Sequence, residues 1–268
     1  MAHGHEADPE TSDLLEAAVE AARAGGRHAL DHYARRAEVH RRFAHDVKLV
    51  LDLEAQQAAE AVLRRRFGAP LVVGEETADT NRPSDNLQWV IDPIDGTVNF
   101  THGLPNWCCS VAARRGGRTL AGAVYAPMMD ELYTAAADGP ARRNGEILRV
   151  SATERLEEAI VTAGFVKRAD DRSVSMNMIE ALCPRVQKLR VMGAAALDLC
   201  NVAGGRVDGY VESRIFLWDV AAGSLIVERA GGRWEVVQPL DTFSMRFVAS
   251  NGRLHDDLRA IVAGAWGG

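Results

Sequence analysis

Residues 89–97 read Trp89-Val90-Ile91-Asp92-Pro93-Ile94-Asp95-Gly96-Thr97 and set two carboxylates at the end of an apolar run. The three apolar residues predict a buried strand, and Pro93 should end its ladder pairing, so that both acids emerge where a sheet gives way to a loop. Gly96 would let the backbone approach an anion, and a helix beginning near Thr97 would attract phosphate to its free N–H groups. Carboxylates beside an anion site imply cations between them.

The spacing of the two acids distinguishes two phosphatase chemistries. An aspartyl-phosphate phosphatase of the haloacid dehalogenase type has Asp-x-Asp-Gly-Thr, in which a nucleophilic and a helper aspartate stand two residues apart. Here Asp92 and Asp95 stand three residues apart. This spacing favours convergence on metal ions, because Mg²⁺ takes one or two carboxylates together with waters and phosphate oxygens. A turn in which an aspartate caps a helix is the alternative explanation.

Two other apolar runs also end in acids. Residues 71–77 read Leu71-Val72-Val73-Gly74-Glu75-Glu76-Thr77, and residues 216–223 place Asp219 where an apolar run passes into a helix of small residues. Taken singly, Asp219 has a simpler explanation as a helix N-cap, and the two glutamates as a solvated loop. Taken together, three strand ends that each offer acid predict a metal site.

The chain resembles the inositol monophosphatase family, the Mg²⁺-dependent, lithium-sensitive sugar phosphatases, over nearly its whole length. Three motifs in family order carry the resemblance: Gly74-Glu75-Glu76-Thr77, Asp92-Pro93-Ile94-Asp95-Gly96-Thr97-Val98-Asn99-Phe100, and Trp218-Asp219-Val220-Ala221-Ala222-Gly223. They are similar to the family's Gly-Glu-Glu-Ser/Thr, Asp-Pro-x-Asp-Gly-Thr-x-Asn-Phe and Trp-Asp-x-Ala-Ala-Gly elements. The resemblance implies an α/β (α+β) fold, a layered α-β-α-β-α sandwich of the inositol monophosphatase and fructose-1,6-bisphosphatase type.

The resemblance also implies roles for individual residues. One Mg²⁺ would be held by Glu75, Asp92 and the carbonyl of Ile94, and a second by Asp92, Asp95 and Asp219, with two or three ions in all. Thr97, Glu75 and Asp52 would be catalytic, with Thr97 and Asp52 orienting the attacking water. The implied substrate contacts are Asp95, Gly96, Thr97, Ala195, Glu212 and Asp219.

One departure from the family pattern concerns the residues before Asp52. The run Asp46-Val47-Lys48-Leu49-Val50-Leu51-Asp52 is similar to an Asp-x-x-x-x-x-Asp element. Many members have Val-Thr where this chain has Lys48-Leu49. The missing threonine hydroxyl alters the expected network around the attacking water.

The implied activity is Mg²⁺-dependent hydrolysis of a phosphate monoester, myo-inositol 1-phosphate or a similar polyol or sugar phosphate. Two cations can clamp the attacking and leaving oxygens and lower the pKa of water, so no side-chain nucleophile is needed. The chain has no Gly-x-Ser-x-Gly elbow and no Gly-rich Lys-Ser/Thr phosphate loop. Family members also use fructose 1,6-bisphosphate, histidinol phosphate or adenosine phosphates. A role as a non-catalytic partner of transcription or RNA-processing machinery is an alternative of another class.

The mouth of the site should decide the substrate. Glu212 favours a polyol, because a carboxylate accepts hydrogen bonds from adjacent hydroxyls, although an exposed acid at a strand end is the alternative. Arg214 and Phe216 follow it and should place a cation and an apolar ring near the leaving group. Arg214 would then bind a second phosphate or be solvated.

Composition fits a globular enzyme of 268 residues with 47% apolar residues. We expect a single domain, with subdomains over about 13–150 and 151–268. A formal charge of −6 argues against nucleic acid as a partner. No apolar run approaches the length of a membrane span and the first dozen residues form no secretory signal, so a cytoplasmic location is expected. The four cysteines should be buried, reduced thiols, and the resemblance implies a homodimer.

Periodicity predicts the elements of each half. The first half should contain helices over 13–33, capped by Asp13 and Glu16, and 53–67, and an antiparallel sheet with strands 71–73, 89–91, 109–114, 121–126 and 131–135. The second half should alternate strands near 159–163, 189–192, 207–211 and 232–237 with helices near 173–186, 194–203 and 219–230. The site would lie at the seam between the halves.

Overall fold

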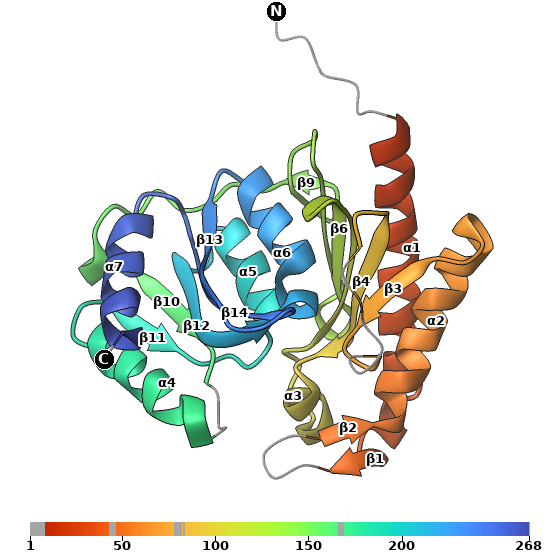
Figure 1. The fold of residues 1–268 in the computed structure, drawn as a ribbon, viewed down its shortest axis with the longest axis horizontal. Helices are drawn as coiled ribbons and strands as arrows, with labels where there is room; N and C mark the ends of the chain where they lie inside the picture. Colours follow the sequence, from red (N-terminus) through yellow and green to blue (C-terminus); the bar gives the residue numbers. More distant parts are fainter. Residues whose placement is uncertain (1–8, 43–46, 78–81, 83, 166–168, 268) are drawn as a thin grey trace, which may run out of the picture.

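The computed structural model describes residues 9–42, 47–77, 82, 84–165 and 169–267, and Asp46 lies outside these ranges. Five layers follow one another across the molecule (Figure 1): helices α4 (Ala169–Leu182) and α7 (His255–Trp266), a sheet, helices α5 (Ala195–Ala203) and α6 (Leu217–Arg229), a second sheet, and helices α1 (Pro9–Asp31) and α2 (Val50–Phe67). The predicted α-β-α-β-α sandwich is confirmed.

The larger sheet has seven strands in the order β3-β4-β5-β6-β7-β8-β9. They are β3 (Leu71–Gly74), β4 (Gln88–Asp95), β5 (Cys108–Arg115), β6 (Arg118–Ala126), β7 (Glu131–Ala136), β8 (Arg142–Arg143) and β9 (Glu146–Ile147). All neighbours pair antiparallel except β3 and β4, which are parallel. Segment 75–87 between those two strands has about the dozen residues that a parallel connection needs. The prediction of an antiparallel sheet is therefore wrong at this edge.

The smaller sheet has five strands in the order β11-β10-β12-β14-β13. They are β10 (Ile160–Ala163), β11 (Lys188–Arg190), β12 (Gly209–Phe216), β13 (Arg233–Pro239) and β14 (Ser244–Ser250). β10 is parallel to both of its neighbours, whereas β14 pairs antiparallel with β12 and β13. A separate two-stranded sheet, β1 (Val39–Arg42) with β2 (Val47–Leu49), and the short helix α3 (Thr97–His102) lie near one another.

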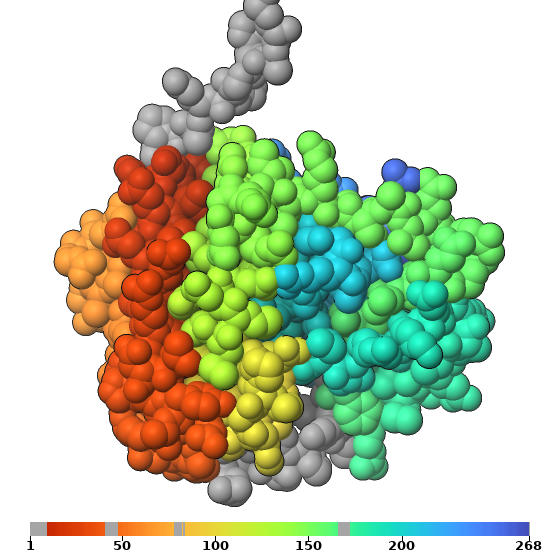
Figure 2. Space-filling model, turned by 180° about the vertical axis from the view of Figure 1, so that it is seen from behind, coloured from red at the N-terminus to blue at the C-terminus, as the bar shows by residue number. Residues whose placement is uncertain are grey.

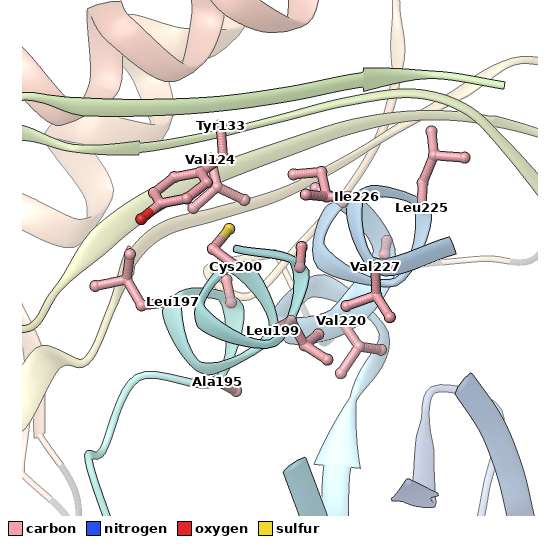
Figure 3. Close-up of a cluster of buried hydrophobic side chains, with 14 of the residues drawn as sticks. Val124, Tyr133, Ala195, Leu197, Leu199, Cys200, Val220, Leu225, Ile226 and Val227 are labelled. Carbon is pink, nitrogen blue, oxygen red and sulfur yellow. The ribbon is translucent and has the colours of Figure 1, made fainter. Parts of the chain in front are cut away.

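The core between the two sheets is packed around α5 and α6. Figure 3 shows Val124 and Tyr133 of the large sheet facing Cys200 of α5 and Ile226 of α6, all of them buried. The small residues of the third motif allow this close approach. A Cβ added at Gly223 would lie 2.6 Å from Leu199 Cδ1, and one added at Gly122 would lie 3.0 Å from Ala222 Cα. Larger side chains there would force the layers apart.

Several predicted boundaries differ from the structure. The first helix already includes Pro9, so Asp13 and Glu16 lie inside it and do not cap it. The second begins at Val50 and α6 at Leu217, two or three residues before the predicted starts. Strand β14, helix α7 and the short strands β1, β2, β8 and β9 were not predicted.

The cysteines and the helices bear on two further predictions. Cys108, Cys109 and Cys200 are buried free thiols, but Cys183 is exposed, so the prediction of a buried thiol is wrong there. Cys183 comes directly after Leu182, the last residue of α4, and so does not belong to the buried face of that helix. No helix in the part of the chain that the structure describes combines the length and apolar character needed to cross a membrane.

Candidate metal and phosphate site

Three carboxylates from distant parts of the chain converge in one place. Asp92 and Asp95 come from the end of β4 and Asp219 from the first turn of α6, and one oxygen of each lies within 4.8 Å of the others. The cavity at this point is also lined by Glu75, Ile94, Gly96 and Thr97. The structure therefore brings all five predicted metal-binding residues around one cavity.

A break in strand pairing aims both acids of β4 at this cavity. Asp92 is paired with Ser110 and Asp95 with Cys108, so three steps on β4 correspond to two steps on β5. Residues three apart on a regular strand point to opposite faces, and one extra residue reverses that orientation. The predicted end of pairing at Pro93 is wrong. The proline, which has no N–H to donate, sits in the irregularity, and the strand continues to Asp95.

The N-terminus of α5 holds Asp95. Its Oδ1 accepts a hydrogen bond of 3.1 Å from the Ala195 N–H, and its Oδ2 accepts one of 2.7 Å from the Ala196 N–H. Burial raises the pKa of Asp95 to about 6, and these N–H groups oppose the rise because they stabilise the carboxylate. The N–H of Ala195, one of the implied substrate contacts, is used by Asp95.

Burial and the charges of neighbouring acids also raise the pKa values of Asp92 and Asp219. Burial, followed by repulsion from Glu75 and Asp95, raises the pKa of Asp92 well above its ordinary range. Burial and the charge of Asp95 raise the pKa of Asp219 to about 8. The alternative of a helix N-cap is wrong for Asp219, because Phe216 is the N-cap and Asp219 is the third residue of the helix. Its Oδ2 accepts the Phe216 N–H at 2.9 Å while the residue lines the cavity.

The donor set fits a hard divalent cation. None of the described residues that line the cavity carries a positive charge, although four of them are acids. Crowded carboxylates repel one another and are costly to bury, and a bound cation would remove that cost. Carboxylate and carbonyl oxygens are the ligands that Mg²⁺ prefers.

Gly96 and Thr97, directly after Asp95, also line the cavity. Gly96 has φ +89°, and a Cβ there would lie 2.7 Å from the Asn106 carbonyl oxygen, so only glycine fits without strain. The Thr97 hydroxyl donates to the Ile94 carbonyl at 3.0 Å. Asn99 Nδ2 donates to the carbonyls of Asn106 at 2.8 Å and Met192 at 2.9 Å. Figure 2 shows the segment near residue 100 (yellow) beside the segment near residue 190 (teal).

Asp52 lies in the first turn of α2, with its side chain buried. Its Oδ2 accepts the Leu49 N–H at 2.6 Å, whereas its Oδ1 has no hydrogen-bond partner in the described structure. Burial and the nearby charge of Glu75 raise its pKa. Asp52 is therefore a neighbour of Glu75, but it is not among the residues that line the metal cavity.

A larger pocket of about 550 Å³ opens beside the carboxylates and shares Asp95 and Asp219 with their cavity. Ala195 and Glu212, two of the implied substrate contacts, line it together with Asp198 and Tyr210. The Tyr210 hydroxyl donates to Glu212, whose pKa is raised to about 8 by burial. Asp198 is 2% exposed, its Oδ1 has no hydrogen-bond partner, and burial raises its pKa.

Asp198 and Tyr210 were not predicted as site residues. A signal for Asp198 was present, because an acid inside an apolar helix of small residues is rarely buried without a reason. Tyr210 gave no such signal, since a tyrosine in an apolar strand is ordinary core.

Two side chains expected at the mouth lie elsewhere. Arg214 Nη1 donates to Ser244 Oγ at 2.8 Å and is paired with Asp241, and Phe216 stacks on Trp218 with centroids 4.9 Å apart. Neither lines the pocket. The register of β12 shifts between Glu212 and Ile215, so the side chains after Glu212 do not continue its orientation. The predicted cation near the leaving group is not supplied by Arg214.

Comparisons with known proteins cover nearly the whole chain. A model described as the inositol monophosphatase family matches residues 10–265. A Pasteurella multocida protein named Nus factor SuhB is 38% identical over 222 residues, covering 82% of this chain and 83% of the relative. A Thermotoga maritima protein named fructose-1,6-bisphosphatase/inositol-1-monophosphatase is 35% identical over 253 residues, 93% of this chain and 96% of the relative. A solved structure of an IMPase from Thermotoga maritima aligns with a TM-score of 0.84 at 34% identity, covering 94% of this chain and 98% of that one.

Proposed function

This chain belongs to the inositol monophosphatase family, and from that premise we propose that it is a Mg²⁺-dependent phosphomonoesterase acting on a polyol phosphate such as myo-inositol 1-phosphate. One observation carries the proposal. The carboxylate cavity opens directly onto a pocket whose other described acids, Asp198 and Glu212, are suited to accept hydrogen bonds from hydroxyls.

The residues of the cavity would have different roles in metal binding, phosphate binding and orientation of the attacking water. Glu75, Asp92 and the Ile94 carbonyl would hold one ion, and Asp92, Asp95 and Asp219 a second. Bound ions would supply charge neutralisation at the phosphoryl group and a lowered pKa of water. The backbone at Gly96 and Thr97 would position the phosphate, and Thr97 and Asp52 would help to orient the attacking water, with Asp52 acting from beside Glu75 and outside the cavity lining.

The pocket favours one class of substrate over another. Its described lining contains four acids and no lysine, arginine or histidine. A second phosphate at the leaving-group end would meet like charge there, whereas hydroxyls would find acceptors. We therefore rank a polyol monophosphate above fructose 1,6-bisphosphate, although one relative is named for both activities.

Phosphate release by the purified protein tests this ranking. The substrates are myo-inositol 1-phosphate, fructose 1,6-bisphosphate, histidinol phosphate and an adenosine phosphate, each with and without Mg²⁺. We expect Mg²⁺-dependent release with the highest kcat/KM for the inositol ester. A higher value for the bisphosphate would contradict the assignment of the pocket.

A non-catalytic partner role is the second candidate, retained because one relative is named a Nus factor. The full acid set argues for catalysis, since a scaffold does not need crowded buried carboxylates. Affinity capture with the wild type and with Asp95→Asn separates the two roles. Partners that survive the substitution would support a second function independent of the metal site.

A further inference from the structure

Lys48, the residue that departs from the family pattern, touches the turn that carries Glu75. Its Nζ donates to the Glu75 carbonyl at 3.0 Å and lies 3.1 Å from Glu76 Oε1. The Glu76 side chain is only 3% exposed, so the alternative of a solvated loop is wrong for this acid. Lys48 belongs to β2 and the turn follows β3, so the contact joins two separate sheets.

The same turn is held from two other directions. The Glu76 N–H donates to Gln56 Oε1 at 3.3 Å, and Gln56 is buried in α2. A Cβ at Gly74 would lie 2.6 Å from that same oxygen, so the backbone packs directly on the amide. The Glu75 N–H donates to the Ile91 carbonyl at 3.2 Å. The backbone of residues 74–76 therefore has a defined partner on α2, on β4 and, through Lys48, on β2.

We propose that Lys48 is a positioning residue for Glu75, which fixes the turn so that the Glu75 carboxylate already faces the metal cavity before an ion binds. The inference rests on the proposed function, because that function makes Glu75 a ligand. A ligand that is ordered in advance costs less conformational entropy on binding. Groups that orient metal ligands without touching the metal typically change affinity by about 10- to 100-fold.

A purely electrostatic role for Lys48 predicts the opposite result. The Lys48 ammonium group is paired with Glu76 and its charge acts on Asp52, and a positive charge near the cavity repels an incoming cation. If Lys48 acted only through its charge, its removal would tighten Mg²⁺ binding. If it positions Glu75, its removal weakens binding, so the sign of the change separates the two roles.

Calorimetric titration of the metal-free protein with Mg²⁺ tests the proposal without turnover. We expect Lys48→Met to bind Mg²⁺ about tenfold more weakly than the wild type. Lys48→Arg should recover most of the loss, because a guanidinium can also donate to both the carbonyl and the carboxylate. Glu76→Gln is the matched control, since it removes the ion pair and leaves the contact of Nζ with the Glu75 carbonyl.

The double variant Lys48→Met/Glu76→Gln guards against misfolding, because it leaves no unpaired buried carboxylate. It should bind Mg²⁺ as weakly as Lys48→Met alone. Wild-type affinity in the double variant, or unchanged or tighter binding by Lys48→Met, would overturn the positioning role while leaving the proposed function intact. A wild-type protein that binds no Mg²⁺ would overturn the proposed function and the positioning role together.

Discussion

The backbone N–H of Ala196 donates a 2.7 Å hydrogen bond to Oδ2 of Asp95, joining residues 101 positions apart in the chain. Asp95 ends a strand of the large sheet, whereas Ala196 lies in the first turn of α5, a helix of the layer between the sheets. The orientation of this carboxylate therefore depends on the packing of the two halves of the chain.

Asp95→Asn should remove the negative charge that would bind the metal and weaken the hydrogen bonding with the N-terminus of α5. One of the two backbone N–H groups would face the new amide NH₂, which cannot accept a hydrogen bond. We expect kcat/KM to fall by about a hundredfold or more, as for loss of one oxyanion donor. Steady-state phosphate release measures it, with Asp256→Asn on the exposed surface of α7 as control. Near-normal turnover in Asp95→Asn would contradict the metal assignment.

Glu212→Gln tests the pocket separately from the metal cavity. A buried hydrogen-bonding group that loses its acceptor costs about 1–3 kcal/mol, so KM for myo-inositol 1-phosphate should rise roughly tenfold. Hydrolysis of p-nitrophenyl phosphate, which offers no hydroxyls, should change little. Asp198→Asn should show the same pattern. An equal loss of kcat/KM on both substrates would mean that these acids act in catalysis and not in recognition of the hydroxyls.

The stability of the metal-free protein should fall as pH rises. Burial raises the pKa of Asp95 to about 6 and of Glu212 and Asp219 to about 8, so the folded state binds these protons more tightly than the unfolded state. Their contribution is fully present below the ordinary carboxyl pKa near 4 and is lost as pH approaches 8. Urea unfolding at pH 5, 6.5 and 8 measures the slope in EDTA and in Mg²⁺. A bound cation should flatten it, and identical slopes in both conditions would refute this explanation.

Asn99→Ala should destabilise the seam between the halves. The Asn99 amide satisfies the carbonyls of Asn106 and Met192, and its loss would leave those acceptors without this donor. We expect a loss of about 1–3 kcal/mol in the free energy of urea unfolding. The exposed Asn177→Ala on α4 should stay within about 0.5 kcal/mol of the wild type. If both variants unfolded alike, Asn99 would have no special role in joining the halves.

Sequence alone could predict the four acids that line the metal cavity, because each follows an apolar run in a recognisable motif. It could not predict how Asp92 and Asp95 come to face the same way, since the pairing break depends on β5. Nor could it place Arg214 against Ser244 or Lys48 against Glu76, because these contacts join segments distant in the chain. Tertiary packing decides such contacts, and local patterns do not carry them.

The most direct test of metal-dependent phosphomonoester hydrolysis is phosphate release from myo-inositol 1-phosphate by the wild type and by Asp219→Asn, with Mg²⁺ and with EDTA. Asp219 comes from the opposite half of the chain to Asp92 and Asp95, and its oxygen lies within 4.8 Å of theirs. We predict release only by the wild type with Mg²⁺. Release in EDTA, or undiminished release by Asp219→Asn, would contradict the proposed metal site.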